Sequence, residues 1–193
     1  MKINAFFSIL AVSVTLMSCS GNTDKIQLFN GTDLSGWEFV LTPDSDVKAE
    51  DVFTVKDGNI HIAGQPFGYM RTSQKYADYT LHVEWRWVGE GTNSGLFQRV
   101  QDGDKLWPNA IECQLCSGKA GDFVMLGGSK IEEMECVEQF PVFERVGDYE
   151  KPVGEWNVAE IRCQGNQITV YINGKLQNQC TCDSTEGYIA LQS

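Results

Sequence analysis

The stretch Tyr79–Val88, with the sequence YTLHVEWRWV, alternates between apolar and polar side chains along its length. The apolar side chains occupy every second position: Tyr79, Leu81, Val83, Trp85 and Trp87. The positions between them hold Thr80, His82, Glu84 and Arg86. A period of two residues is typical of a β-strand, because successive side chains point to opposite faces of a sheet. We therefore predict a strand with one face in a hydrophobic core and one polar face.

Short stretches of this kind recur through the chain, and turn signals separate them. Asp57-Gly58 and Asn173-Gly174 are dipeptides typical of tight β-hairpins. Further predicted strands cover Gly95–Val100, Ala110–Cys116, Asn157–Gln164 and Tyr188–Gln192. Because each strand has one apolar face to bury, we predict an all-β fold, a two-sheet antiparallel sandwich of the lectin-like jelly-roll type.

Residues 117–151 do not show this pattern of short alternating strands. They contain several glycines and an acidic run over 132–138. Loops of this length in compact domains are usually functional or disordered. We expect this segment to rim a binding surface. The acidic run is interpreted as a solvated loop, with a calcium site as the alternative.

Length and charge narrow the choice of partner. A chain of 193 residues fits one domain, and a hydrophobic content of 42% supports a buried core. The chain has 15 Lys and Arg against 26 Asp and Glu, so its formal net charge is −11. This acidity disfavours nucleic acid, whose phosphates it would repel.

The amino terminus has the features of an export signal. Lys2 precedes an apolar run, Ala5–Met17, that is too short to span a bilayer. Leu16–Cys19 resembles the bacterial lipobox, in which the Cys is lipidated. We therefore expect a lipoprotein signal peptide over 1–18, a lipidated Cys19, a polar tether over 19–26 and a single domain over 27–193. A plain signal peptide is the alternative. The expected location is the cell envelope, in the periplasm or at the outer membrane, with the membrane contacted through the lipid anchor.

The other six cysteines allow three interpretations. In an exported protein they fit small buried thiols, one or two disulfides, or a metal cluster. Cys113 and Cys116 form a C-x-x-C pattern, but residues three apart on a strand point to opposite faces, which argues against a shared metal.

Polar residues on two predicted strands are candidates for a binding site. Glu84 and Arg86 share one strand face, and Glu112 and Gln114 share the corresponding face of another strand. Trp107 offers a flat apolar surface of the kind on which sugars stack. The pattern fits a carbohydrate site, and an ordinary solvated sheet face with cross-strand ion pairs is the alternative.

Six motifs in a fixed order carry a family resemblance. They are Phe29–Trp37, Asn93–Arg99, Glu112–Gln114, Gly154–Asn157, Ile172–Gly174 and Gly187–Gln192. With these motifs the chain resembles the 3-keto-disaccharide hydrolase domain family, whose fold is a concanavalin A-like jelly roll. The resemblance covers about Gln27 to Ser193.

The resemblance implies an exported bacterial enzyme that cleaves glycosides whose sugar is oxidised at C3. A ketone at C3 acidifies the C2 proton, so a carboxylate base can remove it. The glycosidic oxygen then leaves by β-elimination, and addition of water completes a net hydrolysis. This route needs a base, a group that stabilises the enolate oxygen and an acid for the leaving group.

On the matched positions, the resemblance implies catalytic roles for two glutamates. Glu112 is the expected base, and Glu84 is the expected acid or a metal ligand. Arg86 and Arg99 are expected to hold the developing oxyanion or sugar hydroxyls. No cofactor is assigned, and a divalent cation stays open as an alternative.

Four further residues are expected to bind the sugar. Gln114 and Asn93 would orient hydroxyls, and Trp107 would stack on the ring. His82 shares the polar face with Glu84 and titrates near neutral pH, but an exposed, merely hydrogen-bonded histidine is the alternative. Asn93 also fits a plain turn, because Asn-Ser-Gly tolerates left-handed backbone conformations.

One departure from the family pattern and two alternative functions stay open. Members of the family continue after the Leu191–Ser193 segment with another strand, so we expect a sandwich that lacks its last strand and has an unpaired edge. The alternative functions are a non-catalytic glycan-binding lipoprotein and a conventional two-carboxylate glycosidase.

Overall fold

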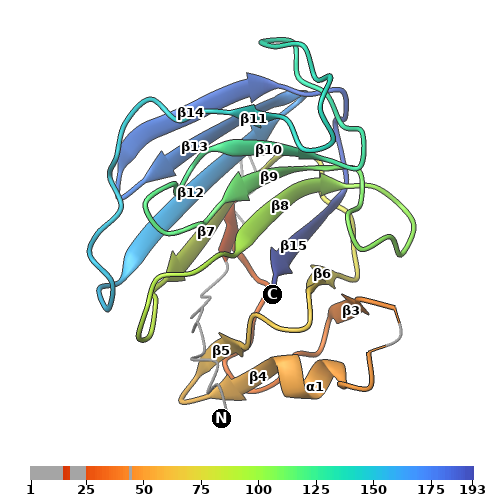
Figure 1. The fold of residues 1–193 in the computed structure, drawn as a ribbon, viewed down its shortest axis with the longest axis vertical. Coiled ribbons are helices and arrows are strands. Elements are labelled where there is room, and N and C mark those ends of the chain that lie inside the picture. The colour runs from red at the N-terminus through yellow and green to blue at the C-terminus, as the bar shows by residue number, and fades with distance from the viewer. Residues whose placement is uncertain (1–14, 18–24, 44) are drawn as a thin grey trace.

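The computed structural model describes residues 15–17, 25–43 and 45–193. Two antiparallel sheets lie face to face, and a separate β-hairpin lies at one end beside a short helix (Figure 1). The predicted all-β sandwich is therefore confirmed. The expected lipidation residue Cys19 and most of the expected signal peptide lie outside the described residues. Within those ranges, no helix is long and apolar enough to cross a membrane.

One sheet has six strands. In spatial order they are β14 (Lys175–Thr181), β13 (Gln167–Ile172), β12 (Asn157–Gln164), β7 (Tyr79–Trp85), β1 (Thr15–Met17) and β2 (Lys25–Gln27). The stretch that predicted the fold forms β7, in the interior of this sheet. Leu81, Val83 and Trp85 are fully buried, whereas His82 and Glu84 on the other face are half-buried.

The second sheet has seven strands. In spatial order they are β11 (Val142–Phe143), β10 (Phe123–Leu126), β9 (Ala110–Gln114), β8 (Gly95–Val100), β15 (Tyr188–Gln192), β6 (Gly68–Thr72) and β3 (Trp37–Leu41). The last strand, β15, lies between β8 and β6 rather than at an edge. The hairpin of β4 (Phe53–Lys56) and β5 (Asn59–Ile62) follows the helix α1 (Ala49–Val52).

The two predicted hairpin turns are confirmed. Asp57 and Gly58 have φ values of 52° and 73°, and Asn173 and Gly174 have values of 50° and 76°. Positive φ at both central residues is the geometry that a tight turn between two right-twisted strands requires. The Asn173 side chain also ties this turn to a neighbouring loop, because its Nδ2 donates to the Tyr149 carbonyl at 2.7 Å.

The expectation of one long loop over 117–151 needs correction. Phe123–Leu126 forms β10, which pairs with β9, and Val142–Phe143 forms β11 at the sheet edge. All four residues of β10 are buried. Its sequence therefore shows an unbroken apolar run, and the alternation that identified the other strands is missing.

The seven-stranded sheet is apolar on both faces, whereas the outer face of β7 in the other sheet is polar. A second hydrophobic cluster lies on the outer face of the seven-stranded sheet: Val40, Tyr69, Phe97, Val100, Ala110, Val124, Leu126 and Ala190. Trp107 and Tyr188 pack against this cluster. A polar side chain on this face therefore lies among apolar neighbours.

All six described cysteines are free thiols, and Cys113, Cys163, Cys180 and Cys182 are buried. Burial raises the pKa of Cys163 to about 12, so this thiol is neutral at physiological pH. Among the described residues, no group of three or more His, Cys, Asp or Glu side chains is placed to hold a metal ion. The interpretation as small buried thiols fits the four buried cysteines, whereas Cys116 and Cys136 are partly exposed.

Candidate functional site

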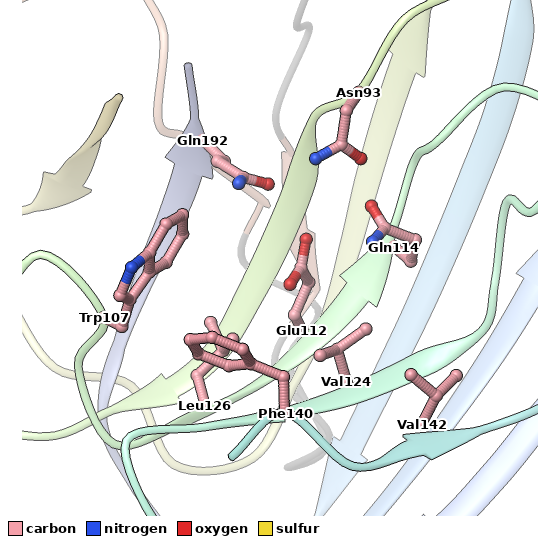
Figure 2. A pocket seen from close by; sticks show the side chains of 9 residues that line it. All are labelled: Asn93, Trp107, Glu112, Gln114, Val124, Leu126, Phe140, Val142 and Gln192. Carbon is pink, nitrogen blue, oxygen red and sulfur yellow. The ribbon is translucent and has the colours of Figure 1, made fainter. Parts of the chain in front are cut away.

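A pocket of about 290 Å³ opens on the outer face of the seven-stranded sheet. Its volume is at the lower end of the roughly 300–1,000 Å³ of small-ligand sites. Nine residues line it: Asn93, Trp107, Glu112, Gln114, Val124, Leu126, Phe140, Val142 and Gln192 (Figure 2). Four of them, Glu112, Gln114, Asn93 and Trp107, were expected site residues.

Strand alternation places Glu112 in this pocket. Ile111 and Cys113 on either side point into the core between the sheets, so Glu112 and Gln114 face outward. Across the sheet Glu112 lies opposite Phe97 of β8 and Val124 of β10. Glu112 therefore has an apolar cross-strand neighbour on each side, and the residue is only 3% exposed.

Burial sets the electrostatics of Glu112. Desolvation raises the pKa of its carboxyl group to about 8. Its Oε1 atom has no hydrogen-bond partner among the described residues. A buried polar atom without a hydrogen-bond partner costs free energy. Titratable groups with shifted pKa values are concentrated at functional sites. The carboxyl group is therefore poised to exchange a proton near neutral pH.

Three amide side chains surround the Glu112 carboxyl group (Figure 2). The Oε1 of Gln192 also lacks a partner among the described residues. The side-chain oxygen of Gln114 is already hydrogen-bonded, because Oε1 accepts from the backbone N–H groups of Leu115 and Cys116, both at 3.1 Å. Its amide nitrogen stays available to a ligand.

The Asn93-Ser94-Gly95 motif shapes the pocket as well as the chain direction. The Ser94 hydroxyl donates to the Gln192 carbonyl at 2.9 Å and so ties the segment to β15. A Cβ at Gly95 would collide with Oε1 of Glu112 and would lie 2.9 Å from Oε1 of Gln192. Glycine at this position leaves the space into which both side chains point.

The opposite wall of the pocket is apolar. Val124 and Leu126 of β10 line this side together with Val142 and the rings of Trp107 and Phe140 (Figure 2). The two rings are 5.8 Å apart, edge to face, in a favourable aromatic geometry. The pocket therefore has one polar side around the carboxyl group and one apolar side.

Three expected site residues lie on or directly after β7 of the other sheet, which ends at Trp85. Glu84 and His82 belong to β7 and contact each other, with 3.3 Å between His82 Nε2 and Glu84 Oε1. The Arg86 guanidinium lies 4.9 Å from the centre of the Trp156 ring. None of the three lines the Glu112 pocket, because they face outward from the six-stranded sheet.

Arg99 is buried and holds backbone segments together. Its guanidinium donates to the carbonyl groups of Tyr76 at 3.2 Å, Ala77 at 2.6 Å and Gly165 at 2.8 Å. These bonds use both terminal nitrogens of the guanidinium within the fold, and Arg99 does not line the pocket.

Gln192 and Phe140 line the pocket although the sequence pattern predicts no role for either residue. Gln192 ends both the Gly187–Gln192 motif, which carries the family resemblance, and the predicted strand Tyr188–Gln192. Neither pattern assigns it a chemical role. Phe140 lies in the segment expected to rim a binding surface, and no local pattern distinguishes it from other loop aromatics.

Comparisons with solved structures find the same fold in carbohydrate-active proteins. A candidate glycosyl hydrolase from Parabacteroides distasonis ATCC 8503 gives a TM-score of 0.58 at 20% identity, covering 86% of each chain. The carbohydrate-binding module CBM66 from Bacillus subtilis gives 0.54 at 15% identity, covering 82% of this chain and 87% of that one. A β-glucanase from Bacillus licheniformis gives 0.53 at 12% identity, covering 93% and 84%. The fold is thus the concanavalin A-like sandwich of glucanases and carbohydrate-binding modules.

Sequence comparison identifies the family. A search of curated proteins found no match. The sequence profile of the 3-keto-alpha-glucoside-1,2-lyase-like domain matches residues 24–193. Because this match covers most of the chain, the protein belongs to the 3-keto-alpha-glucoside-1,2-lyase-like domain family.

Proposed function

We propose that the protein cleaves 3-keto-glycosides by elimination and hydration, with Glu112 as the base. One observation carries this proposal: a buried carboxyl group with a pKa of about 8 faces a pocket in a domain of the lyase-like family. A base with a pKa near the working pH combines a useful ionised fraction with high proton affinity. At pH 7, about a tenth of such groups are ionised.

In the proposed reaction, Glu112 takes the proton from C2, and the electron pair of that C–H bond forms the enolate with the C3 ketone. The enolate then collapses to a C1=C2 double bond and expels the glycosidic oxygen. That oxygen takes a proton from the Glu112 carboxyl group or from water. Water finally adds across the double bond, with oxygen at C1 and hydrogen at C2, and releases the 3-keto-sugar.

The surrounding amides suit the charge that develops. Negative charge moves from Glu112 to the C3 oxygen, and the amide N–H donors of Gln114, Asn93 and Gln192 lie around the carboxyl group. Donors fixed before the reaction stabilise an oxyanion without reorganisation. The apolar wall strengthens these interactions because it keeps water away.

The pocket does not favour a conventional glycosidase. Such enzymes place two carboxyl groups roughly 5–9.5 Å apart across the glycosidic bond. Among the described residues that line the pocket, Glu112 is the single carboxyl group. A single carboxyl group fits proton abstraction from an acidified C–H bond.

A non-catalytic glycan-binding role is the second candidate. The rings of Trp107 and Phe140 beside three amides support it, because stacking surfaces and amide donors are sufficient to bind a sugar.

A paired assay separates these roles. Wild-type protein should release 4-nitrophenol from its 3-keto-glucoside and should leave the unoxidised glucoside intact. Glu112→Gln should lose release but still bind the 3-keto-sugar in calorimetry, whereas Glu84→Gln serves as a matched control outside the pocket and should keep activity. Binding without release by the wild-type protein would favour the non-catalytic role.

For location, we propose export and lipid anchoring in the cell envelope through Cys19, on the basis of the lipobox resemblance. Labelled palmitate should enter the wild-type protein and should not enter Cys19→Ala. Equal labelling of both would contradict the anchor.

A further inference from the structure

Three aromatic rings form a continuous strip that begins in the pocket and leads out of it. The Trp107 ring lies 5.8 Å from Phe140 and 6.2 Å from Phe67, measured between ring centres. Trp107 and Phe140 line the pocket with Glu112, and Phe67 lies beyond its lining. The strip thus extends the apolar wall away from the carboxyl group.

Both ends of the strip are exposed, and Trp107 between them is half-buried. Phe67 is 46% exposed and Phe140 is 37% exposed. Large apolar side chains that gather at the surface beside a pocket usually mark a contact with a ligand or partner. Three distant parts of the chain each contribute one ring to it.

The backbone holds the outer end of the strip in place. The Phe67 carbonyl accepts hydrogen bonds from both the N–H group of Thr42, at 2.8 Å, and its hydroxyl, at 2.9 Å. Trp107 packs against the apolar cluster on the outer face of the sheet. A surface ordered before binding loses little conformational entropy when a ligand stacks on it.

The division of the pocket indicates which part of a substrate this strip contacts. The amides and Glu112 gather on one side and suit the oxidised sugar, whose oxygens need hydrogen-bond partners. Val124, Leu126, Val142 and the rings form the other side. A leaving group rich in hydroxyls would find few partners there, and burying unpaired polar groups is costly. An apolar leaving group would suit this wall.

We propose that Phe67, Trp107 and Phe140 form a leaving-group subsite, and that the preferred substrates are 3-keto-glycosides of aromatic alcohols. This inference rests on the proposed function, because it assigns the sugar to the Glu112 side of the same pocket. Stacking of one aromatic ring on such a surface contributes about 2-fold to 13-fold in affinity.

Benzyl and methyl 3-keto-glucosides test the subsite, because their alcohols have similar acidity and leave with similar ease. For the wild-type protein, kcat/KM for the benzyl glycoside should exceed that for the methyl glycoside about tenfold. Phe67→Ala and Phe140→Ala should each lower this ratio at least threefold. Leu176→Ala, which shortens an exposed apolar side chain on β14, is the control and should keep the wild-type ratio.

The outcomes separate the subsite from the reaction. A benzyl-to-methyl kcat/KM ratio near one for the wild-type protein would overturn the subsite, and so would a ratio that neither phenylalanine variant lowers. In both cases cleavage of the two glycosides would still uphold the proposed function. If neither glycoside is cleaved, the proposed function fails, and calorimetry with the same two glycosides then decides the subsite. Tighter binding of the benzyl glycoside that is lost in both phenylalanine variants would support it, and equal binding would overturn it.

Discussion

Gly95 on β8 leaves open the space that Glu112 on β9 points into. A Cβ at Gly95 would collide with the Oε1 atom of Glu112 and would also lie close to Gln192. The unpaired carboxyl oxygen therefore faces a space that exists because residue 95 has no side chain. The absence of a side chain on one strand thus keeps the functional group of the next strand accessible.

Gly95→Ala should accordingly reduce activity by displacing the Glu112 carboxyl group. We expect kcat/KM for a 3-keto-glucoside to fall about 100-fold, because a misplacement of about 1 Å can cost that much. Gly91→Ala is the matched control, since its Cβ would meet the Ser117 side chain outside the pocket. Equal activity of Gly95→Ala and wild type would show that the space beside Glu112 is not used.

The pH dependence of kcat/KM should report the ionisation of Glu112. The pKa of its carboxyl group is about 8, and a base acts in its ionised form. Activity should therefore rise about tenfold per pH unit below pH 8 and level off above it. Rates measured from pH 5 to 9.5 check this. Activity that falls as the pH rises would assign Glu112 the role of an acid instead.

The same carboxyl group should lower the stability of the fold as the pH rises. In the unfolded chain it ionises near its ordinary pKa of 4.5, whereas in the folded protein it stays protonated up to about 8. Between these values the unfolded state alone releases the proton, so the free energy of unfolding falls by about 5 kcal/mol at most.

Glu112→Gln should remove this loss. Its melting temperature should match the wild-type value near pH 4.5 and exceed it by several degrees near pH 8.5, as measured by thermal unfolding. Parallel curves for the two proteins across this range would contradict the raised pKa.

Arg99→Leu should destabilise the protein without changing the pocket. It would remove the Arg99 donor from the carbonyl groups of Ala77 and Gly165. The Tyr76 carbonyl would also lose Arg99 but would keep the N–H group of Gly187, at 3.1 Å. We expect a loss of about 3 kcal/mol or more in the free energy of unfolding. The folded fraction should keep its KM, since Arg99 does not line the pocket. A raised KM at unchanged stability would restore Arg99 as a substrate-binding residue.

Strand alternation predicted the face of each strand but not its neighbours. Glu84 and Glu112 occupy similar local patterns, yet β7 lies in the six-stranded sheet and β9 in the seven-stranded one. Which sheet a strand joins depends on long-range pairing, and one strand's sequence does not encode it. The burial of Glu112 likewise comes from Phe97 and Val124 on neighbouring strands.

A strand that is covered on both faces lacks the alternation that predicts a strand from sequence. Phe123–Leu126 has no alternation of polar and apolar residues because both of its faces are buried, so the sequence pattern predicts a loop there. The partners of Trp107 in the aromatic strip cannot be predicted for a different reason. Phe67 and Phe140 lie far apart in the chain, and folding alone brings them to the same tryptophan.

The fate of the C2 hydrogen tests the central claim most directly. A 3-keto-glucoside deuterated at C2 should be cleaved in ordinary water with loss of the deuterium to solvent, measured by mass spectrometry of the released sugar at early times. Product incubated without enzyme corrects for spontaneous exchange, and Glu112→Gln should release no sugar. Sugar that is released with its deuterium intact would contradict proton abstraction at C2 and with it the role of Glu112 as the base.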